Sequence, residues 1–391
     1  MGVRESMLNG VSVSIPSADL PLTLSDRWLA WRDRIQGSER FQRWAASFPL
    51  TRPIALARSR ALFDLTAGFV YTQTLTACVQ IGLFEFLAEK PRTLAEVANH
   101  ASLPLEETGR LLRAAMALKL VQERSHKRFG NGPLGAPMIG NTALNRMIEH
   151  NALLYNDLRN PVEMLRSAGP RNRLVLDAFP YTSVANPETF QRSVVEEYSR
   201  LMADTVEPIA RELLDTYPLD GVTSLLDIGG GEGSFCAAVA ARYLDIKLGL
   251  FDLPAVIEGA RPRLEKLGVE GRVTCHGGNF HADTLPQGHQ IITLLRVLLD
   301  HDDTAVLKLL QKVRGAVARG GRVLIVEPFA GVPGAEVVGD VYFGFYLRAM
   351  GRGRARTIDE LRTLLSAAGF SSVRVVKTRY PVYAGMLVAE P

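Results

Sequence analysis

A glycine-rich turn between acidic residues occupies residues 225–233, Leu-Leu-Asp-Ile-Gly-Gly-Gly-Glu-Gly. An apolar run ends at Asp227, turns through the glycines and continues into a helix-like segment. A strand, a tight turn and a helix start form the place where an α/β sheet binds a nucleotide-like ligand. A second apolar run, residues 246–251, ends at Asp252. An acidic residue at the tip of this next strand is the usual acceptor for ribose hydroxyls.

The spacing of the glycines distinguishes between two cofactors. A dinucleotide fingerprint reads G-x-G-x-x-G, but after Gly229 and Gly231 its third glycine position holds Ser234. The negative charges of Asp227 and Glu232 would repel a pyrophosphate and attract a cationic sulfonium and its ammonium group. The turn therefore favours S-adenosylmethionine over NAD.

The bulk composition excludes several classes of protein. The chain has 391 residues, 47% hydrophobic and 22% charged, which is typical of soluble domains and long enough for two cores. The net charge of +4 is too small to indicate nucleic-acid binding. Cys78, Cys236 and Cys275 lack metal-ligand spacing, so no metal is expected and the thiols should be reduced, as in the cytoplasm. No apolar run is long enough to span a membrane.

The N-terminal extension, residues 1–60, changes character along its length. Residues 1–25 are polar and interrupted by proline, so we expect them to be mobile. Residues 26–60 interleave eight arginines with three tryptophans and two phenylalanines. This mixture predicts an amphipathic helix, which either lies on a membrane surface or packs its aromatic side chains on a partner subunit.

Residues 61–140 read as a winged-helix domain, in which apolar helices precede a short pair of strands. Thr93 and Glu96 form a capping-box pattern at one helix start. Glu106 and Glu107 open a later helix, where a DNA-reading helix would carry basic or amide side chains. The pattern therefore favours a homodimer formed through this domain, with no nucleic acid bound.

The remaining chain predicts a helical connector, residues 141–218, and a catalytic domain, residues 219–391. From residue 223 onward strands and helices alternate, which implies a parallel sheet with helices on both faces. We expect seven strands, at residues 224–228, 248–251, 273–276, 290–295, 322–327, 373–377 and 383–388.

Four motifs stand in the order and spacing of a known enzyme family. They are Leu-Asp-Ile-Gly-Gly-Gly at 226–231, Phe-Asp-Leu-Pro at 251–254, Gly-Gly-Asn-Phe at 277–280 and Ala-Ala-Gly-Phe at 367–370. From about residue 65 to 390 the chain resembles the S-adenosylmethionine-dependent O-methyltransferases related to the caffeate and hydroxyindole enzymes. Segments 150–158, 296–301 and 339–354 are most similar to the bacterial hydroxyneurosporene (demethylspheroidene) O-methyltransferases of carotenoid synthesis.

The resemblance implies a Rossmann-like domain whose last strand runs antiparallel, behind a winged-helix dimerisation domain. It also implies that Asp252 accepts from the ribose and that Asn279 and Phe280 flank the adenine. Arg296 stands where a basic residue often lies near the cofactor, although a surface ion pair would equally explain it. The expected cofactor-binding residues are Asp227, Gly229, Gly231, Asp252, Leu253, Gly278, Asn279, Phe280 and Arg296.

One position departs from the family. Plant-type members carry His-Asp-Trp after the fourth strand, and that histidine deprotonates a phenol, whereas this chain has Leu299, Asp300 and His301. Leu299 cannot take a proton. His301 is the first substitute for the base and His150 the second, and Asp300 either partners His301 or caps the following helix.

The acceptor pocket is expected to be apolar, as a long polyene would need. Some of its residues at helical spacing would instead pack the sheet. The arginine run 348–356 would meet anionic headgroups or form a solvated face. The expected acceptor-binding residues are Tyr155, Met164, Tyr342, Phe345, Tyr346 and Met350.

The sequence thus predicts a homodimeric O-methyltransferase that uses S-adenosylmethionine, releases S-adenosylhomocysteine and methylates the tertiary hydroxyl of an acyclic hydroxycarotenoid. Methylation of a phenolic or polyketide hydroxyl is the alternative activity. A winged-helix regulator that senses S-adenosylmethionine is the alternative of another class. We expect a cytoplasmic protein with peripheral membrane contact.

Overall fold

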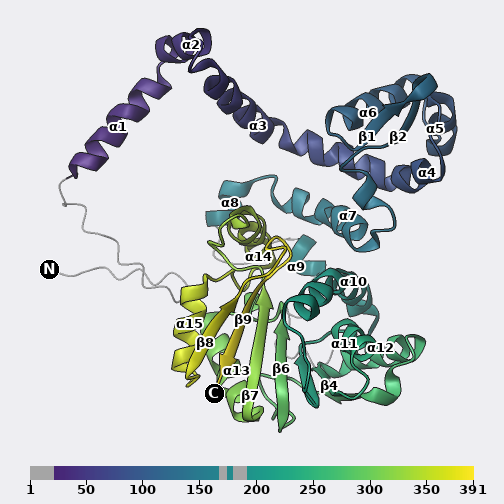
Figure 1. Cartoon of the computed structure of the whole chain (residues 1–391), viewed down its shortest axis with the longest axis vertical. Helices are drawn as coiled ribbons and strands as arrows, with labels where there is room; N and C mark the ends of the chain where they lie inside the picture. Colours follow the sequence, from purple (N-terminus) through teal and green to yellow (C-terminus); the bar gives the residue numbers. More distant parts are fainter. Residues whose placement is uncertain (1–21, 167–173, 179–191) are drawn as a thin grey trace. The chain divides into compact units, whose positions relative to one another are not determined.

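A computed structural model describes residues 22–166, 174–178 and 192–391, which form two compact units that divide between Asn141 and Thr142 (Figure 1). Most of the N-terminal segment expected to be mobile, and the start of the helix expected after residue 187, lie outside these residues. None of the described helices is both long and apolar enough to cross a bilayer.

The N-terminal unit is helical and ends in a β-hairpin. Its helix α3 crosses residue 60, where the sequence predicted a boundary, and the Thr93–Glu96 capping box forms as expected. Val121–Arg124 (β1) and Arg128–Asn131 (β2) pair antiparallel. The helices are α1 Leu24–Gly37, α2 Glu39–Ser47, α3 Arg52–Gln80, α4 Leu83–Glu89, α5 Leu94–Ala101 and α6 Leu105–Ala117.

The second unit is built on a seven-stranded sheet in the order β5-β4-β3-β6-β7-β9-β8. β9 runs antiparallel to both of its neighbours, β7 and β8, and the other described strand pairs of this sheet are parallel, so the predicted antiparallel last strand is confirmed. β7 begins earlier than predicted, and its pairing with β6 shifts register near its start. β9 begins later than predicted, because a turn precedes it. The strands are β3 Ser224–Ile228, β4 Lys247–Asp252, β5 Val273–Gly277, β6 His289–Leu295, β7 Val317–Glu327, β8 Ser372–Val376 and β9 Gly385–Glu390.

Helices cover both faces of this sheet, because alternate residues of each strand point to opposite faces. Leu225 belongs to the apolar core shared with α10, α11 and α12, whereas Leu226 belongs to the core shared with α13 and α15. These helices are α10 Arg192–Thr216, α11 Ser234–Arg242, α12 Pro254–Lys266, α13 Asp303–Ala316 and α15 Ile358–Ala367.

The remaining helices of this unit lie beside the carboxyl ends of the parallel strands. A π-helix, Val337–Phe343, continues directly into α14, which packs against the connector helices. A π-turn inside a helix is often found at functional sites. The bounds are α7 Thr142–Asp157, α8 Pro161–Arg166, α9 Leu174–Ala178 and α14 Gly344–Met350.

Candidate active site

A cavity of about 380 Å³ opens at the carboxyl ends of β3, β4 and β6, within the second unit. In open α/β sheets, ligands bind at these strand ends. Of the residues predicted to bind cofactor, all but Gly278 line this cavity. Of those predicted to bind the acceptor, Tyr342, Tyr346 and Met350 line it.

The turn after β3 requires glycine. Gly229, Gly231 and Gly233 adopt φ angles of 67°, 57° and 79°, which L side chains rarely adopt. A Cβ on Gly229 would lie 2.8 Å from the Val297 side chain. Gly231 has open space beside it, so its requirement comes from the backbone conformation and not from a collision within the protein.

Asp227 lies fully buried beneath this turn. Its Oδ1 accepts a 2.6 Å hydrogen bond from the Thr293 hydroxyl, while Oδ2 has no partner among the described residues. Burial raises the pKa of Asp227 to about 7. A buried carboxyl without a compensating positive charge is costly, so the site favours a cationic ligand.

Asp252 is anchored at the tip of β4. Its Oδ2 accepts from the Gly231 amide at 2.8 Å and its Oδ1 from the Leu253 amide at 2.7 Å. Burial raises the pKa of Asp252 to about 6, although the hydrogen bonds from these two amides act to lower it. Each carboxylate oxygen keeps a further lone pair, so Asp252 can still accept from a pair of ribose hydroxyls.

The loop after β5 is held from below by α13. Lys312 Nζ donates to the carbonyls of Phe280, His281 and Asp283 at 2.8–3.0 Å. The Asn279 Oδ1 accepts from the His281 amide at 2.9 Å, and Asn279 lines the cavity. Gly278 begins this loop but does not line the cavity, and a Cβ on it would lie 2.8 Å from the Phe251 ring.

His301 belongs to this loop's aromatic cluster. Its ring lies edge-on to Phe280, with centroids 5.4 Å apart, and to His281, at 4.9 Å. Burial, followed by the neighbouring His281, lowers the pKa of His301 to about 3. The ring is therefore neutral at physiological pH and lies beside the residue expected to flank adenine.

Asp300 also lines the cavity, and burial and the charge of Glu327 raise its pKa to about 8. It does not cap the following helix, as one prediction held. Asp302 does so, accepting from the Ala305 amide at 2.8 Å. Asp300 precedes that N-cap by two positions, and its side chain lines the cavity.

Arg296 is half-buried and lines the cavity. Its guanidinium donates to Thr205 Oγ1 at 2.9 Å and to the Met202 carbonyl, tying the end of β6 to α10. Its φ of 54° is unusual for a residue with a side chain. Such a backbone is held only where the surroundings determine it, and here it directs the arginine into the cavity wall.

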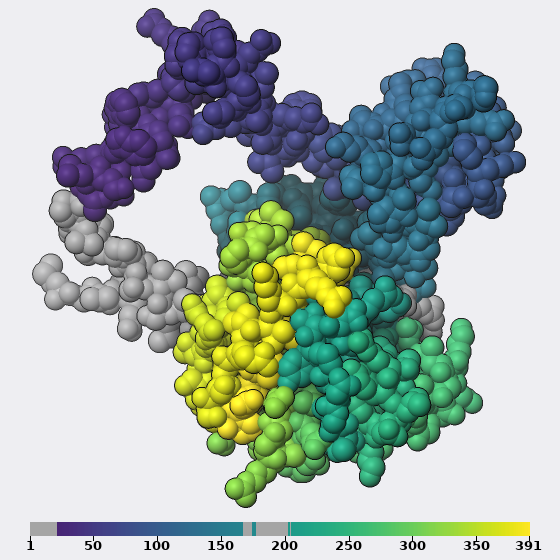
Figure 2. Space-filling view, in the orientation of Figure 1, coloured from purple at the N-terminus to yellow at the C-terminus, as the bar shows by residue number. Residues whose placement is uncertain are grey.

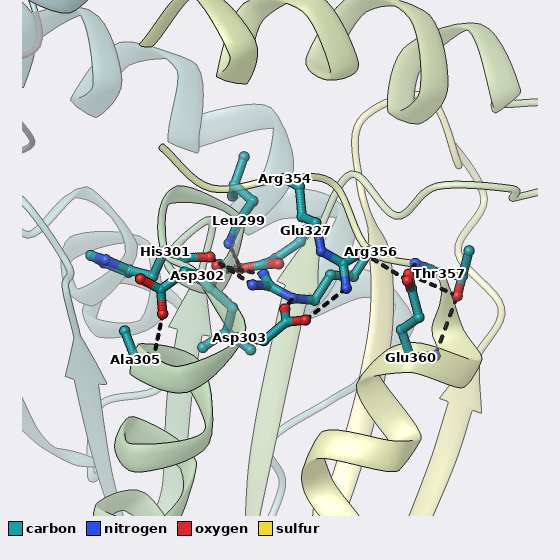
Figure 3. A network of polar contacts seen from close by, with 11 residues as sticks. Leu299, His301, Asp302, Asp303, Ala305, Glu327, Arg354, Arg356, Thr357 and Glu360 are labelled. Carbon is teal, nitrogen blue, oxygen red and sulfur yellow. Dashed lines mark hydrogen bonds and ion pairs between the residues drawn. The ribbon is translucent and has the colours of Figure 1, made fainter. Parts of the chain in front are cut away.

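A buried polar network fixes the turn at residues 298–301 (Figure 3). The Glu327 carboxylate accepts from the amides of Leu298 and Leu299. The fully buried Arg356 donates to the Leu298 and His301 carbonyls and pairs with Asp303 at 2.8 Å. Burial raises the pKa of Glu327 to about 7 in spite of these contacts.

This network corrects the expectation for the arginine run. Arg354 and Arg356 neither meet headgroups nor form a solvated face, because both pair internally with Asp303. Their approach depends on Gly353, whose φ is 72° and where a Cβ would lie 2.0 Å from the Leu299 carbonyl. The arginines at 354 and 356 lie in the segment between α14 and α15, which is neither helix nor strand.

The acceptor end of the cavity is apolar. Leu299, which replaces the family's histidine, is buried in one cluster with Met164, Tyr346 and Met350. Phe345 packs on this cluster from outside the cavity lining. Tyr155 and Met164 likewise do not line the cavity, and of the two only Met164 belongs to this cluster.

Two tyrosine hydroxyls bring polarity to this apolar end. Tyr346 Oη lies 2.9 Å from His150 Nε2, and Tyr342 Oη donates to Asn151 Oδ1 at 2.9 Å. The two rings stack with centroids 5.8 Å apart. His150 therefore reaches the cavity through Tyr346, because it does not line the cavity itself.

The roles of Asn151 and Glu327 were not predicted from the sequence, and Arg356 was predicted only as part of an exposed arginine run. Glu327 carried a recognisable signal, because it is a carboxylate that ends an apolar strand. The contacts of Arg356 and Asn151 gave no signal, since their partners are distant in sequence. Within the described residues no group of His, Cys, Asp and Glu could hold a metal ion.

Comparison with known proteins agrees with this geometry. Residues 155–371 match the O-methyltransferase domain, and residues 63–141 match the O-methyltransferase dimerisation domain. The chain belongs to the O-methyltransferase family. The predicted enzyme class, a methyltransferase dependent on S-adenosylmethionine, is confirmed, and the alternative of a regulator finds no support.

Several relatives match most of the chain. Demethylspheroidene O-methyltransferase of Cereibacter sphaeroides is 38% identical over 91% of this chain and 93% of that protein. Acetylserotonin O-methyltransferase of Mus musculus is 30% identical over 84% and 87%. The crystal structure of human N-acetylserotonin methyltransferase in complex with S-adenosylmethionine shares the fold, with a TM-score of 0.71 at 23% identity over 85% and 97% of the chains.

The residues at the cavity fit this cofactor. Asp227 offers an unpartnered buried oxygen, and Asp252 and Asp300 add two more carboxyls to the same wall. A sulfonium and an ammonium would offset this negative charge, whereas the pyrophosphate of NAD would add to it. The fit supports the cofactor that the turn after β3 predicted.

Proposed function

We propose that this enzyme methylates the tertiary hydroxyl of an acyclic hydroxycarotenoid of the hydroxyneurosporene or demethylspheroidene type, giving a methoxy carotenoid. The carrying observation is the apolar acceptor end, where Leu299 packs with Met350 and Tyr346 in place of a catalytic histidine. A polyene favours such a lining because its burial removes apolar surface from water. The names of the relatives at 36–38% identity support the same acceptor class.

Donor binding falls to the turn after β3 and the tip of β4. When bound, S-adenosylmethionine supplies a methyl group on a positively charged sulfur and is released as S-adenosylhomocysteine. We propose that Asp227 offsets the donor's positive charge and that Asp252 accepts from its ribose. Gly229 and Gly231 adopt the positive φ angles that the turn requires, and they place no side chain beside the donor. Asn279 and Phe280 would contact the adenine.

Acceptor positioning falls to Tyr342 and Tyr346. Their hydroxyls are polar groups on an otherwise apolar wall, so each can hydrogen-bond an alcohol. Orienting the alcohol oxygen toward the methyl carbon supplies about 7–11 kcal/mol in favourable cases. Because a tertiary alcohol is a weak acid, its proton leaves late in the reaction.

We propose that His150 accepts this proton through Tyr346. As the alcohol passes its proton to Tyr346 Oη, that oxygen passes its own proton to His150 Nε2, 2.9 Å away. His301 is a weaker candidate, because burial lowers its pKa to about 3 and its ring lies with Phe280. Asp300, whose pKa burial raises to about 8, is the rival base within the cavity.

A phenolic acceptor is the alternative, since acetylserotonin O-methyltransferase of Mus musculus is 30% identical to this chain. Leu299 argues against it, because the histidine that would deprotonate a phenol is missing. We also propose that the enzyme is a homodimer formed through residues 63–141 and that it works in the cytoplasm.

The decisive experiment supplies the purified full chain with S-adenosylmethionine and a hydroxylated acyclic carotenoid in detergent. We expect a product whose mass has gained one methyl in place of a hydrogen. A panel of simple phenols and polyketide hydroxyls serves as the comparison. Faster turnover of any of these than of the carotenoid would replace the proposed acceptor with the alternative.

A further inference from the structure

Helix α1 carries most of its large apolar side chains on one face, although none of its residues is buried. Leu24, Trp28, Trp31 and Ile35 follow one another at spacings of four, three and four, which places them on one face of a helix. Leu24 is 84% exposed, and Trp28 and Trp31 are each 57% exposed.

The charged residues of α1 are distributed about this apolar face. At about 100° per residue, Arg27 and Arg34 fall on one flank and Arg32 on the other. Asp26 and Asp33 fall on the opposite side of the helix. An apolar centre with basic flanks and an acidic back is the pattern of a helix that lies in a membrane interface.

Helix α2 repeats the pattern on a smaller scale. Phe41, Trp44 and Phe48 are three and four residues apart, and their rings touch in sequence, with centroids 5.6 Å and 5.2 Å apart. Trp44 is 50% exposed. Figure 2 shows the side chains of α1 and α2, in purple, open on the face in view.

The charge of the segment argues for an anionic partner. Residues 22–62 hold eight arginines against three acidic residues, an excess larger than the net +4 of the whole chain. They also precede the matched dimerisation domain, residues 63–141. A second copy seated on this face would bring two positively charged segments together, whereas anionic headgroups would be attracted.

We propose that α1 and α2 dock on the surface of a bilayer that contains anionic phospholipid, with the tryptophans at the headgroup boundary. The arginines on the flanks extend toward the phosphates while their stems cover apolar surface. The inference goes beyond the proposed methylation and does not depend on the identity of the acceptor, because docking is measured without acceptor.

Tryptophan fluorescence gives a direct test, because all three tryptophans of the chain, Trp28, Trp31 and Trp44, lie in these helices. With vesicles of phosphatidylglycerol and phosphatidylcholine, the emission of the full chain should shift to the blue. Brominated lipid tails should quench it. No shift, or an equal shift with phosphatidylcholine alone, would overturn the proposal.

Co-sedimentation with the same vesicles tests the arginines that flank the apolar face of α1. Replacing Arg27, Arg32 and Arg34 with Gln should weaken binding about 100-fold, since each basic residue near an anionic surface contributes about five-fold. Arg128→Gln, Arg319→Gln and Arg374→Gln together remove the same charge from exposed positions elsewhere and should have little effect. Equal losses in both sets would mean that net charge, and not α1, determines binding.

Two leucine substitutions test the apolar face. Leu24 lies on this face, so Leu24→Ser should weaken vesicle binding. Leu29 lies well off it, so Leu29→Ser should leave vesicle binding unchanged. Light scattering of Trp28→Ser with Trp31→Ser decides between a bilayer and a second copy. An unchanged mass with lost vesicle binding supports the bilayer, and a fall to the monomer mass contradicts it.

Discussion

Asp227 is the residue whose charge state depends most on the ligand. One carboxylate oxygen is bonded to Thr293, and no described residue bonds to the other. Burial raises its pKa to about 7, so without a cation the group is partly protonated near neutral pH. A bound cation favours the ionised form and lowers this pKa, and by linkage the ionised form binds the cation more tightly.

Binding of S-adenosylmethionine should therefore tighten as the pH rises from 6 to 8, because Asp227 loses its proton in that window. Asp227→Asn should weaken binding of S-adenosylmethionine about tenfold at pH 8, the effect of roughly one pKa unit. S-adenosylhomocysteine lacks the sulfonium charge and serves as the control ligand in calorimetry. Both ligands carry the ammonium group, so equal losses for both would contradict an interaction of Asp227 with the sulfonium.

The proposed proton path makes a second prediction at this scale. His150→Gln and Tyr346→Phe should each lower kcat about 100-fold or more, within the range of general-base catalysis, while KM for the donor changes little. His301→Gln should instead alter the donor's KM, because its ring lies against Phe280. If Asp300→Asn alone abolishes kcat, Asp300 is the base.

At the scale of elements, the turn between β6 and α13 is held by side chains from two other elements. Glu327, at the end of β7, accepts hydrogen bonds from two backbone amides of the turn. Arg356, before α15, donates to two of its backbone carbonyls (Figure 3). The turn carries Leu299, Asp300 and His301 into the cavity wall. Donor and acceptor ends of the site therefore share one support.

Removing the guanidinium should loosen both ends together. Arg356→Met leaves Asp303 and the turn's carbonyls without their buried donor, so the free energy of unfolding should fall by about 3–5 kcal/mol. Arg362→Met breaks an exposed pair with Asp359 and should change it by less than about 0.5 kcal/mol. Urea unfolding measures both, and equal effects would mean that the network stabilises nothing.

At the scale of the whole molecule, the chain combines a family dimerisation domain with an exposed apolar helix. Along α3, Leu62, Phe63, Leu65 and Phe69 are each more than 60% exposed. Apolar patches of this kind on one chain usually mark an interface. The proposed homodimer would bury them.

Charged substitutions on α3 test this assembly. Leu65→Arg with Phe69→Arg should shift the mass in sedimentation from dimer to monomer, because arginines would be buried without partners. Ala57→Arg changes an exposed position on the opposite side of the same helix and should leave the mass unchanged. A dimer that survives the double change would place the interface elsewhere in the chain.

The sequence by itself determined the elements and the cofactor. The central strands of the sheet were short apolar runs, and the turn after β3 had its glycines and Asp227 close together in sequence, so periodicity and local spacing were sufficient for them. Asp252 was likewise predicted from local sequence, since it ends a strand. The family resemblance added the antiparallel final strand, for which the chain offered only weak local signals.

Only the tertiary structure decided what surrounds Leu299. His150 and Tyr346 are 196 positions apart, and Arg356 meets the turn it supports across more than 50 residues. No periodicity relates such partners, because packing of the sheet and helices brings them together. The same packing buries His301 beside Phe280 and turns a run of arginines inward, so charge and histidine content alone could not locate the base.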